Sequence, residues 1–472
     1  MYRIPLYLFN GLLFLSPVFA NLEASPDAST RSAIVGEAIL HNEGYRLLET
    51  MTTRYGPRMA GTEGNIRSMD LLEDELQQLG IETRREPYSI PGWIRGDDRV
   101  TLVSEPARPL RAAALGYIAP HEPFEAGVAV VDSVDLDQIE ADSLRGKIAL
   151  FVPNLRFSPA DYDRLAEDFG VVGGLQINRV NGGQLLARMS GREGHPPPFP
   201  VYNITVEEGR WIQGQLEKGM PVRVRMETRS KPTPMTIDNL VAVLPGRSDQ
   251  IIVVGGHFDS WDLGQGAIDN GLGVAQLFDT ARLLKKHSAS NEYTVEIVFF
   301  NAEEWGLWGS KDYAERHDLA AVRCMLNLDM VGEPIAINAM GFDQQVPFLE
   351  DYVKSLGGWH LKAKVDNKPW LGSDHHPFIL QGVPAITFNA PVAPDDVRYY
   401  HDFADTFEKV DSEMLARATA LVALLAYDLA NDTDTDLQQL NEEETAELFR
   451  KAGLEKRMRN AGQWPFADVP EE

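Results

Sequence analysis

The amino-acid sequence predicts an α/β protein in which a mixed, mostly parallel sheet is flanked by helices and interrupted by an inserted strand-rich domain. First, strand-like and helix-like segments alternate from residue 236 to residue 430, which is typical of a sheet covered on both faces. Second, residues 96–235 instead contain many short strand-like runs separated by Pro, Gly and Asp turns. Third, the first half of the alternating fold precedes this insertion, in residues 21–95.

The amino terminus has the pattern of a secretory signal peptide. Residues 1–20 carry Arg3, an apolar stretch from about Leu6 to Leu15, and small residues before Asn21. We therefore expect cleavage near Ala20 and a secreted or periplasmic mature protein. No Cys follows the apolar run, so a lipid anchor is not expected, and no later stretch has the roughly 18 to 20 apolar residues of a membrane span.

Composition limits the classes of function. A formal net charge of -26 over 472 residues argues against nucleic acid or an anionic membrane as a partner. Cys324 is the only cysteine, so the fold must be stabilised by its core rather than by disulfides. A homodimer is compatible with the sequence, which leaves the oligomeric state open.

The elements before residue 236 follow in order. Apolar residues at helical spacing predict helices within 29–50 and 64–79, separated by a Gly- and Pro-bounded loop at 55–61. A strand at 81–90 and a break at 91–96 complete this part. The insertion contains strand-like runs and no cluster of His and carboxylates, so we expect it to shape access or assembly rather than chemistry; the runs are 100–103, 127–131, 147–152, 171–177 and 222–226.

The alternating second part, residues 236–430, is followed by an acidic carboxyl-terminal extension, residues 431–472, with a helix predicted over 437–457. The expected strands are 239–244, 250–254, 294–301, 323–328 and 385–388. The expected helices are 272–286, 306–316, 346–356 and 411–429. In parallel sheets of this kind, functional sites lie at the carboxyl ends of the strands.

Polar side chains follow three of these strands. The candidate site residues at or beyond the strand ends are His257, Asp259, Asp269, Glu303, Glu304, Asp329 and His401. Two imidazoles and three carboxylates, one of them bridging, suit two zinc-like ions, and the remaining glutamate would be free to act as a base. Taken singly, each has an ordinary alternative, such as a charged first helical turn at Glu303 and Glu304. Spacing does not decide which of these two glutamates is the base.

Five segments carry a resemblance to a known family: residues 255–271 (GGHFDSWDLGQGAIDNG), 299–310, 327–332, 372–378 and 399–411. Together they resemble the dinuclear zinc exopeptidases of the aminopeptidase and glutamate carboxypeptidase family. The resemblance covers roughly Leu47 to Ala430, and the inserted segment resembles a protease-associated domain. It implies a zinc-dependent exopeptidase that hydrolyses dipeptides or short peptides.

The resemblance also assigns roles. It implies that Asp269 bridges two zinc ions, that His257 and Asp329 complete the first, and that Glu304 and His401 complete the second. Glu303 would be the general base. Asp259 would orient His257 through the other ring nitrogen, and the Asp269-Asn270 peptide bond would be cis.

The substrate side is less determined by the sequence. Tyr400 precedes a predicted ligand and either stabilises the oxyanion or packs in the core. Ser373 or Asp374 could bind a substrate terminus. Asp374 could instead be the N-terminal residue of a helix, in which case His375 and His376 would be exposed. We find no Arg pair that commits the site to a carboxyl terminus, so aminopeptidase, dipeptidase and carboxypeptidase action all stay open.

Two other classes of function compete. An inactive family member would serve as a binding module, but such proteins lose ligand positions and none is lost here. A single-zinc glutaminyl cyclase on the same fold would need fewer ligands than are present. Whether the insertion covers the site is left open.

Overall fold

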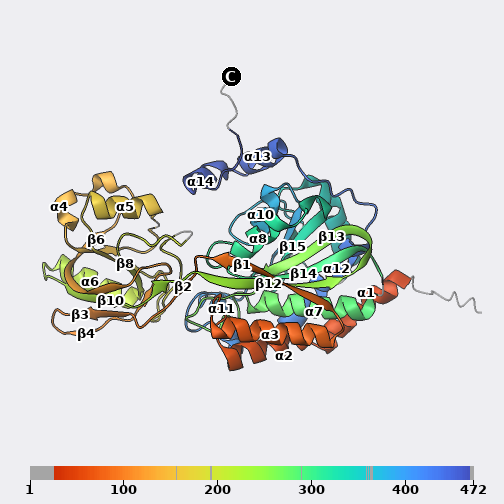
Figure 1. Cartoon of the computed structure of the whole chain (residues 1–472), viewed down its shortest axis with the longest axis horizontal. Coiled ribbons are helices and arrows are strands. Elements are labelled where there is room, and N and C mark those ends of the chain that lie inside the picture. The colour runs from red at the N-terminus through yellow and green to blue at the C-terminus, as the bar shows by residue number, and fades with distance from the viewer. Residues whose placement is uncertain are drawn as a thin grey trace, which may run out of the picture.

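The computed structural model describes residues 26–155, 157–191, 194–288, 290–357, 359, 361 and 365–467. The predicted signal peptide lies outside the described residues. Figure 1 shows two parts side by side: a large sheet with helices on both faces, and a smaller strand-rich part at its left.

The larger part is built on a seven-stranded sheet. Its order is β1 (Glu82–Ile90), β12 (Met235–Leu244), β14 (Asn291–Phe300), β13 (Gly246–His257), β15 (Val322–Asn327), β17 (Ala385–Asn389) and β16 (Ala336–Asn338). The four strands β14, β13, β15 and β17 are parallel, whereas β1, β12 and β16 run antiparallel to their neighbours. The predicted mixed α/β sheet is therefore confirmed, with its parallel strands in the centre.

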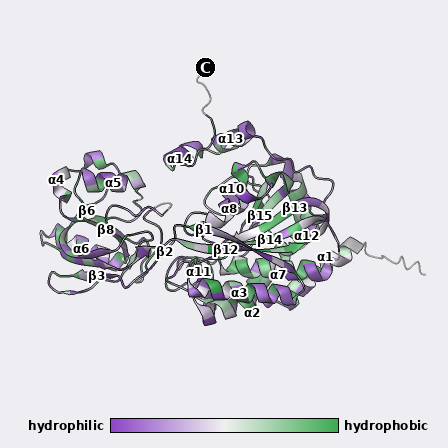
Figure 2. Cartoon of the chain, in the orientation of Figure 1, coloured by the Kyte–Doolittle hydropathy of each residue, from purple (hydrophilic) through white to green (hydrophobic). Residues whose placement is uncertain are grey.

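Alternate residues of the central strands pack against helices on opposite faces. In β13, Ile252 and Val254 belong to one apolar core, and Val253 belongs to another. The first core includes α1 (Pro26–Leu40), α2 (Glu43–Thr50), α3 (Glu63–Gln78), α7 (Gly271–His287), α9 (Val346–Ser355) and α12 (Ser412–Asn431). The second includes α8 (Trp308–Arg316) and α10 (His375–Leu380). Figure 2 shows apolar residues concentrated in the central strands and polar residues on the outer surfaces of the helices.

The smaller part, which we call the inserted lobe (residues 99–228), has an eight-stranded sheet. Its order is β4 (Arg108–Pro109), β3 (Arg99–Leu102), β10 (Arg223–Thr228), β6 (His121–Val131), β7 (Ile148–Phe151), β8 (Gly173–Ile177), β9 (Val201–Ile204) and β5 (Ala112–Ala114). The helices α4 (Ala141–Leu144), α5 (Pro159–Glu167) and α6 (Val206–Glu217) pack beside it. The chain enters through β2 (Trp93–Ile94) and leaves through β11 (Lys231–Pro232), which pair with each other.

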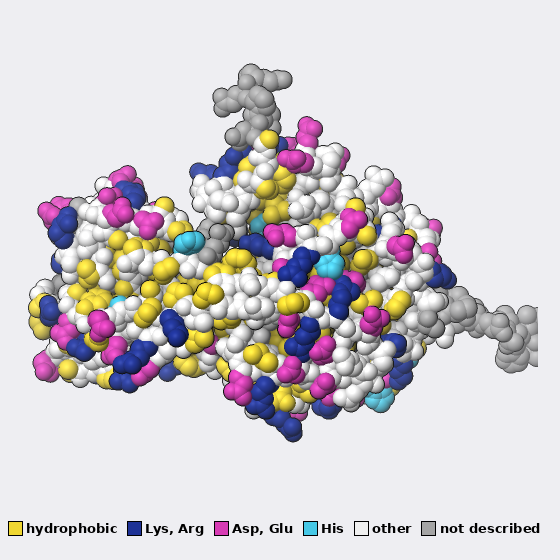
Figure 3. Space-filling view, viewed as in Figure 1, with side chains coloured by type: hydrophobic (Ala, Val, Ile, Leu, Met, Phe, Trp, Pro, Cys, Tyr) yellow, Lys and Arg dark blue, Asp and Glu magenta, His cyan; other side chains and the backbone are white. Residues whose placement is uncertain are grey.

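The carboxyl-terminal extension forms two helices instead of the single one predicted over 437–457. They are α13 (Glu442–Lys451) and α14 (Glu455–Asn460). Gly453 separates them with a φ of 70°, a left-handed conformation that ends a helix. Phe449 and Met458 pack on the segment that contains α10. In Figure 3 the surface is indented between the inserted lobe and these helices.

Among the described residues, the helices are all too short or too polar to cross a membrane.

Candidate metal centre

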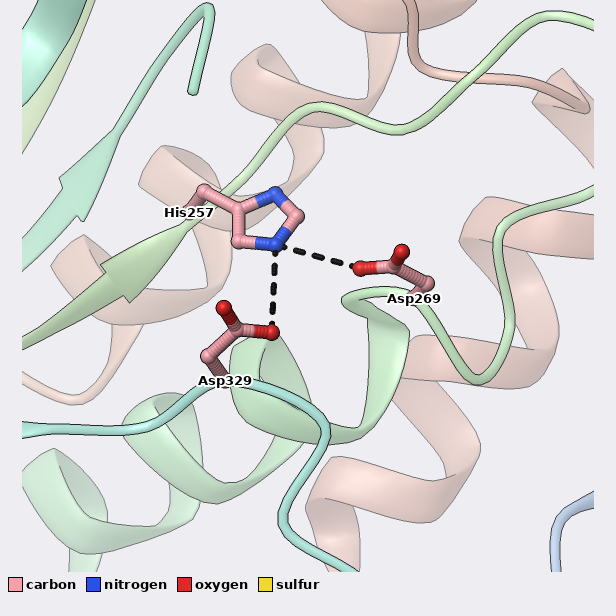
Figure 4. A group of neighbouring side chains, drawn as sticks. All are labelled: His257, Asp269 and Asp329. Atoms are coloured by element: carbon pink, nitrogen blue, oxygen red, sulfur yellow. Dashed lines mark ion pairs between the residues drawn. The ribbon is translucent and has the colours of Figure 1, made fainter. Parts of the chain in front are cut away.

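Two neighbouring parallel strands and one loop bring the first group of predicted ligands together. His257 is the last residue of β13, and Asp329 follows β15 by two residues. Asp269 lies in the loop that leads into α7. His257 Nε2 is 3.2 Å from Asp269 Oδ1 and 3.5 Å from Asp329 Oδ1 (Figure 4).

The second group shares Asp269 with the first. His401 Nε2 lies 2.9 Å from Asp269 Oδ2 and 3.1 Å from Glu304 Oε2. Each carboxylate oxygen of Asp269 therefore faces a different imidazole. Both groups have ligand atoms close enough to surround one ion.

The hydrogen bonds of the two rings test whether a cation fits here. His257 Nδ1 is 3.1 Å from the carbonyl of Asp259, and His401 Nδ1 is 2.9 Å from that of Ala187. When each Nδ1–H donates to its carbonyl, the Nε2 atom of a neutral ring carries a lone pair that points toward carboxylate oxygens. Such an arrangement needs a cation between Nε2 and these oxygens. Asp269 Oδ1 and Glu304 Oε1 are buried without a hydrogen-bond partner in the described part of the chain. This nitrogen and oxygen donor set fits zinc.

Burial and the close approach of imidazoles and carboxylates shift the pKa values of these side chains when no metal is bound. Burial opposes protonation of His401, but Glu304 and Asp269 raise its pKa to about 10. Likewise, despite its burial, His257 has a pKa well above the usual range because of Asp259, Asp269 and Asp329. Burial raises the pKa of Glu304 to about 7, with Asp269 contributing and His401 opposing. Protons thus occupy positions that a bound metal would take.

Asn270 connects the first group of ligands through its side-chain amide. Its Nδ2 donates to the carbonyls of His257 (3.1 Å) and Leu328 (2.8 Å), and its Oδ1 accepts from the backbone N–H groups of Gly273 and Met330. The peptide bond before it is cis, as the resemblance implies. The sequence signal for this role was only an Asn before a Gly-rich helix start.

The carboxylate of Asp259 contacts the backbone of the two glutamates more closely than it contacts the histidine ring. Its carboxylate accepts from the backbone N–H of Glu303 (3.0 Å) and of Glu304 (3.3 Å). The expected carboxylate contact with His257 Nδ1 is longer, at 3.7 Å, and the Asp259 carbonyl is closer. Asp259 thus fixes the turn that presents both glutamates, because it is fully buried and bonded to both backbone groups.

Glu303 lies beside the ligands and is partly exposed. One of its carboxylate oxygens lies within 4.8 Å of ligand atoms of His257 and Glu304. Burial raises the pKa of Glu303 well above the usual range, with Glu304 and Asp329 adding to the rise and His257 opposing it. In the metal-free protein these surroundings therefore favour the protonated form of Glu303.

The inserted lobe contacts the loop that carries His401. The N–H of Ala187 donates to the carbonyl of His401 (3.0 Å), and the Ala187 carbonyl faces the His401 ring. The N–H of Leu185 donates to Asp402 Oδ2 (2.6 Å). His401 itself has a backbone φ of 57°, which is uncommon for a residue other than Gly. The hydrogen bonds from the lobe stabilise this conformation. The lobe, expected only to shape access or assembly, therefore also helps to hold a candidate ligand.

A cavity of about 730 Å³ lies between the lobe and the segment that carries His401. Tyr400 and His401 line it from one side, and their rings stack with centroids 3.6 Å apart. From the lobe, residues of β8 and of the segment 186–191 line it. A substrate in this cavity would touch both parts of the molecule.

Ser373 and Asp374 lie outside this cavity, although Asp374 is close enough to His257 and Asp329 for their charges to act on it. Both are fully buried and neither lines this cavity. Ser373 Oγ accepts a hydrogen bond from Asn327 Nδ2 (2.9 Å), which ties it to the end of β15. The exposure considered for His375 and His376 is wrong, since both are buried where α10 packs on the sheet. Burial favours a supporting role for Ser373 and Asp374 over direct contact with substrate.

Comparisons with a protein family and with individual proteins both find similarity to peptidases. Residues 239–426 match the profile of Peptidase family M28. From the motif at residues 259–271 we expect a particular similarity to carboxypeptidase Q. The chain is 26% identical to human carboxypeptidase Q over 419 residues, which cover 84% of this chain and 87% of that protein. It is also 25% identical over 413 residues to an aminopeptidase of Bacillus subtilis, covering 81% and 84%.

Solved structures show the same fold. A peptidase M28 precursor from Shewanella amazonensis superposes with a TM-score of 0.78 at 28% identity, covering 88% of this chain and 100% of that one. A zinc aminopeptidase from Bacillus subtilis superposes with a TM-score of 0.66 at 23% identity, covering 85% and 98%.

Proposed function

We propose that this chain, which belongs to peptidase family M28, is a zinc-dependent exopeptidase that hydrolyses dipeptides or short peptides with a free amino terminus. The proposal rests mainly on the position of Asp269, whose two carboxylate oxygens face the imidazoles of His257 and His401. Glu303 lies beside these residues and is not needed as a ligand. This is the arrangement that a two-ion hydrolase requires.

In this proposal His257 and Asp329 would hold one zinc ion, Glu304 and His401 would hold the other, and Asp269 would be a ligand of both. When bound, two such ions lower the pKa of a water molecule and polarise the carbonyl group of the substrate.

Glu303 acts as the general base. Its carboxylate accepts a proton from the attacking water and then donates it to the leaving amine. The Asp259 hydrogen bond to the Glu303 backbone keeps this side chain at the edge of the ligand cluster. The position of this carboxylate beside His257 and Glu304 supports the assignment.

Tyr400 stabilises the negative charge that develops on the carbonyl oxygen. Burial raises the pKa of its hydroxyl well above the usual range, with Asp269 and Glu304 adding to the rise, so the group remains a donor. Stacking on His401 fixes the ring at the wall of the cavity.

We also propose export of the protein after cleavage near Ala20, and that residues 96–235 form a protease-associated-like domain. Export does not change the chemistry of the site, but it would place the enzyme among extracellular or periplasmic peptides.

Product analysis tests the proposed activity. The mature protein is incubated with zinc, or with a chelator, on a free dipeptide, the same dipeptide blocked at its amino end, and a longer peptide. We expect chelator-sensitive cleavage that the block abolishes, and the longer peptide separates aminopeptidase from dipeptidase action. Cleavage despite the block would indicate carboxypeptidase specificity. Absence of any chelator-sensitive cleavage would favour an inactive binding module.

Glu303→Gln tests the assignment of the base. The substitution keeps the size of the side chain but removes the proton acceptor, so kcat should fall by about 10²- to 10⁴-fold. Zinc content should stay that of the wild type, because Glu303 is not among the proposed ligands. Glu315→Gln, on the exposed face of α8, is the matched control. A Glu303→Gln enzyme with wild-type kcat would show that another group is the base.

A further inference from the structure

Arg58 has a fully buried side chain whose guanidinium group reaches the loop between two candidate ligands. We call residues 258–268, between His257 and Asp269, the ligand loop. Arg58 Nε donates to the carbonyl of Phe258 (2.9 Å), Nη1 to that of Gln265 (3.1 Å) and Nη2 to that of Gly266 (2.8 Å).

These three carbonyls lie at the two ends of the ligand loop. Phe258 follows His257 directly, whereas Gln265 and Gly266 come shortly before Asp269. One planar guanidinium therefore joins the beginning of the loop to its end, which the fork-like geometry of arginine allows. The backbone N–H of Arg58 also donates to Ser260 Oγ (3.0 Å) inside the loop.

The surroundings of Arg58 are unusual for a buried cation. Among the described residues, no carboxylate lies within ion-pair distance of it, and its side-chain partners are backbone carbonyls. Burial lowers the pKa of Arg58 to about 10, against the opposing effect of Asp405, Asp259 and Asp269, so it stays charged at neutral pH. Burying a charge without a direct counterion is costly.

Arg282 shows the more usual solution in the same molecule. It is nearly buried as well, but it pairs with Asp279 (2.6 Å) and Glu37 (3.1 Å) on α7 and α1. Its position on the helical layer makes it a control for the loss of a buried arginine.

Asn65 and Asp405 complete the support around the ligand loop. Asn65 Nδ2 donates to the carbonyl of Arg58 (2.8 Å), which ties Arg58 to α3. The Asp405 carboxylate accepts from the N–H groups of Ile268 (2.7 Å) and Asp269 (3.1 Å). The loop end that carries Asp269 is thus held from both sides.

We propose that Arg58 is a positioning residue of the metal centre: by joining the two ends of the ligand loop, it sets the separation of His257 and Asp269 that metal binding needs. The inference rests on the proposed function only in that the site binds zinc. An 11-residue loop without regular structure would otherwise have to be ordered at the moment of binding, at a cost in conformational entropy.

Zinc affinity of the folded, metal-free protein tests this inference, measured by competition with a chelator alongside the melting temperature. Arg58→Met should weaken zinc binding by about 10- to 100-fold, the range found when groups that orient metal ligands are removed. Arg58→Lys should fall between Arg58→Met and the wild type, because lysine restores the charge but cannot span three carbonyls. Arg282→Met should lower the melting temperature and leave zinc affinity unchanged.

Two results would overturn the inference: folded Arg58→Met with wild-type zinc affinity, or an equal loss of affinity in Arg282→Met. If Arg58→Met does not fold, Arg58→Lys decides, since wild-type affinity in that variant would exclude a role for the fork geometry. Failure of the wild-type protein itself to bind zinc would contradict the proposed function, and the inference with it.

Discussion

The two halves of the candidate metal centre are held in different ways. The strand-held half consists of His257 and Asp329 around Asp269, and the loop-held half consists of Glu304 and His401 around the same Asp269. In the strand-held half, β13 and β15 pair in parallel, so their carboxyl ends lie at one edge of the sheet. The Asn270 amide then bonds to the backbone beside both ligands.

The loop-held half depends on a contact between distant segments. His401 follows α11 (Pro394–Val397) in a segment without a strand, and its backbone has a positive φ. Its ring and backbone contact Ala187 of the inserted lobe, more than two hundred positions earlier in the chain. Sheet topology therefore places His257 and Asp329, whereas His401 needs the lobe to be docked.

Substitution of Asp269, the ligand that the two halves share, should affect both halves equally. Asp269→Ala removes an oxygen from each half, so the protein should lose both zinc ions and about 10³-fold or more in turnover, because several kcal/mol of metal-assisted stabilisation disappear. Elemental analysis and kinetics check this. Asp249→Ala, on the exposed beginning of β13, should change neither. A variant at 269 that kept one ion at full occupancy would mean that Asp269 is not shared.

Single histidine substitutions should separate the halves. His257→Ala should empty only the strand-held half and His401→Ala only the loop-held half, each reducing the zinc stoichiometry from two to one, because each ring lies closest to the carboxylates of its own half. Elemental analysis after dialysis is the measurement. Loss of both ions from either variant would show that the halves bind zinc as one unit.

The lobe contact should matter to one half only. Asp402→Ala removes the acceptor of the Leu185 N–H, and we expect about tenfold weaker zinc binding in the loop-held half, with the strand-held half unchanged. Chelator competition on His257→Ala, with and without Asp402→Ala, isolates the affected half. Glu208→Ala, which breaks the Arg108 pair within the lobe, is the control. Equal weakening by both would point to general loosening of the lobe.

Acidification should weaken the loop-held half. In the metal-free protein His401 has a pKa of about 10 and Glu304 of about 7, and both must be deprotonated to bind zinc. Binding therefore releases protons, and affinity should fall as the pH falls from about 8 to about 6. Chelator competition at each pH, again on His257→Ala, measures this. An affinity independent of pH would mean that zinc displaces no proton there.

The sequence predicts the strand-held half well for a physical reason. Runs such as 250–254 and 323–328 are apolar enough to identify buried central strands, and polar residues directly after them must lie at the sheet edge. The helices α7 and α12 follow from apolar periodicity in the same way. The site roles drawn from the resemblance remain predictions for the substitutions above.

The remaining features depend on contacts that leave no pattern in the chain. The bonds of Arg58 and of Ala187 are to or from backbone groups, which every residue has, so neither the partner nor the distance can be read from residue types. The burial of His375 and His376 depends on how α10 packs against the sheet and α8. Gly453 does carry a signal, and the split between α13 and α14 could have been expected from it.

The contact of Ala187 with His401 has a consequence for how this site varies among related proteins. Because the group that orients the ring is a main-chain carbonyl, any small residue at position 187 would supply it equally well. Evolution can therefore change the side chain there without changing the tautomer of the histidine, while insertions or deletions in the neighbouring segment would displace the carbonyl. Selection in this part of the lobe should act on the length of the segment more than on its residue identities.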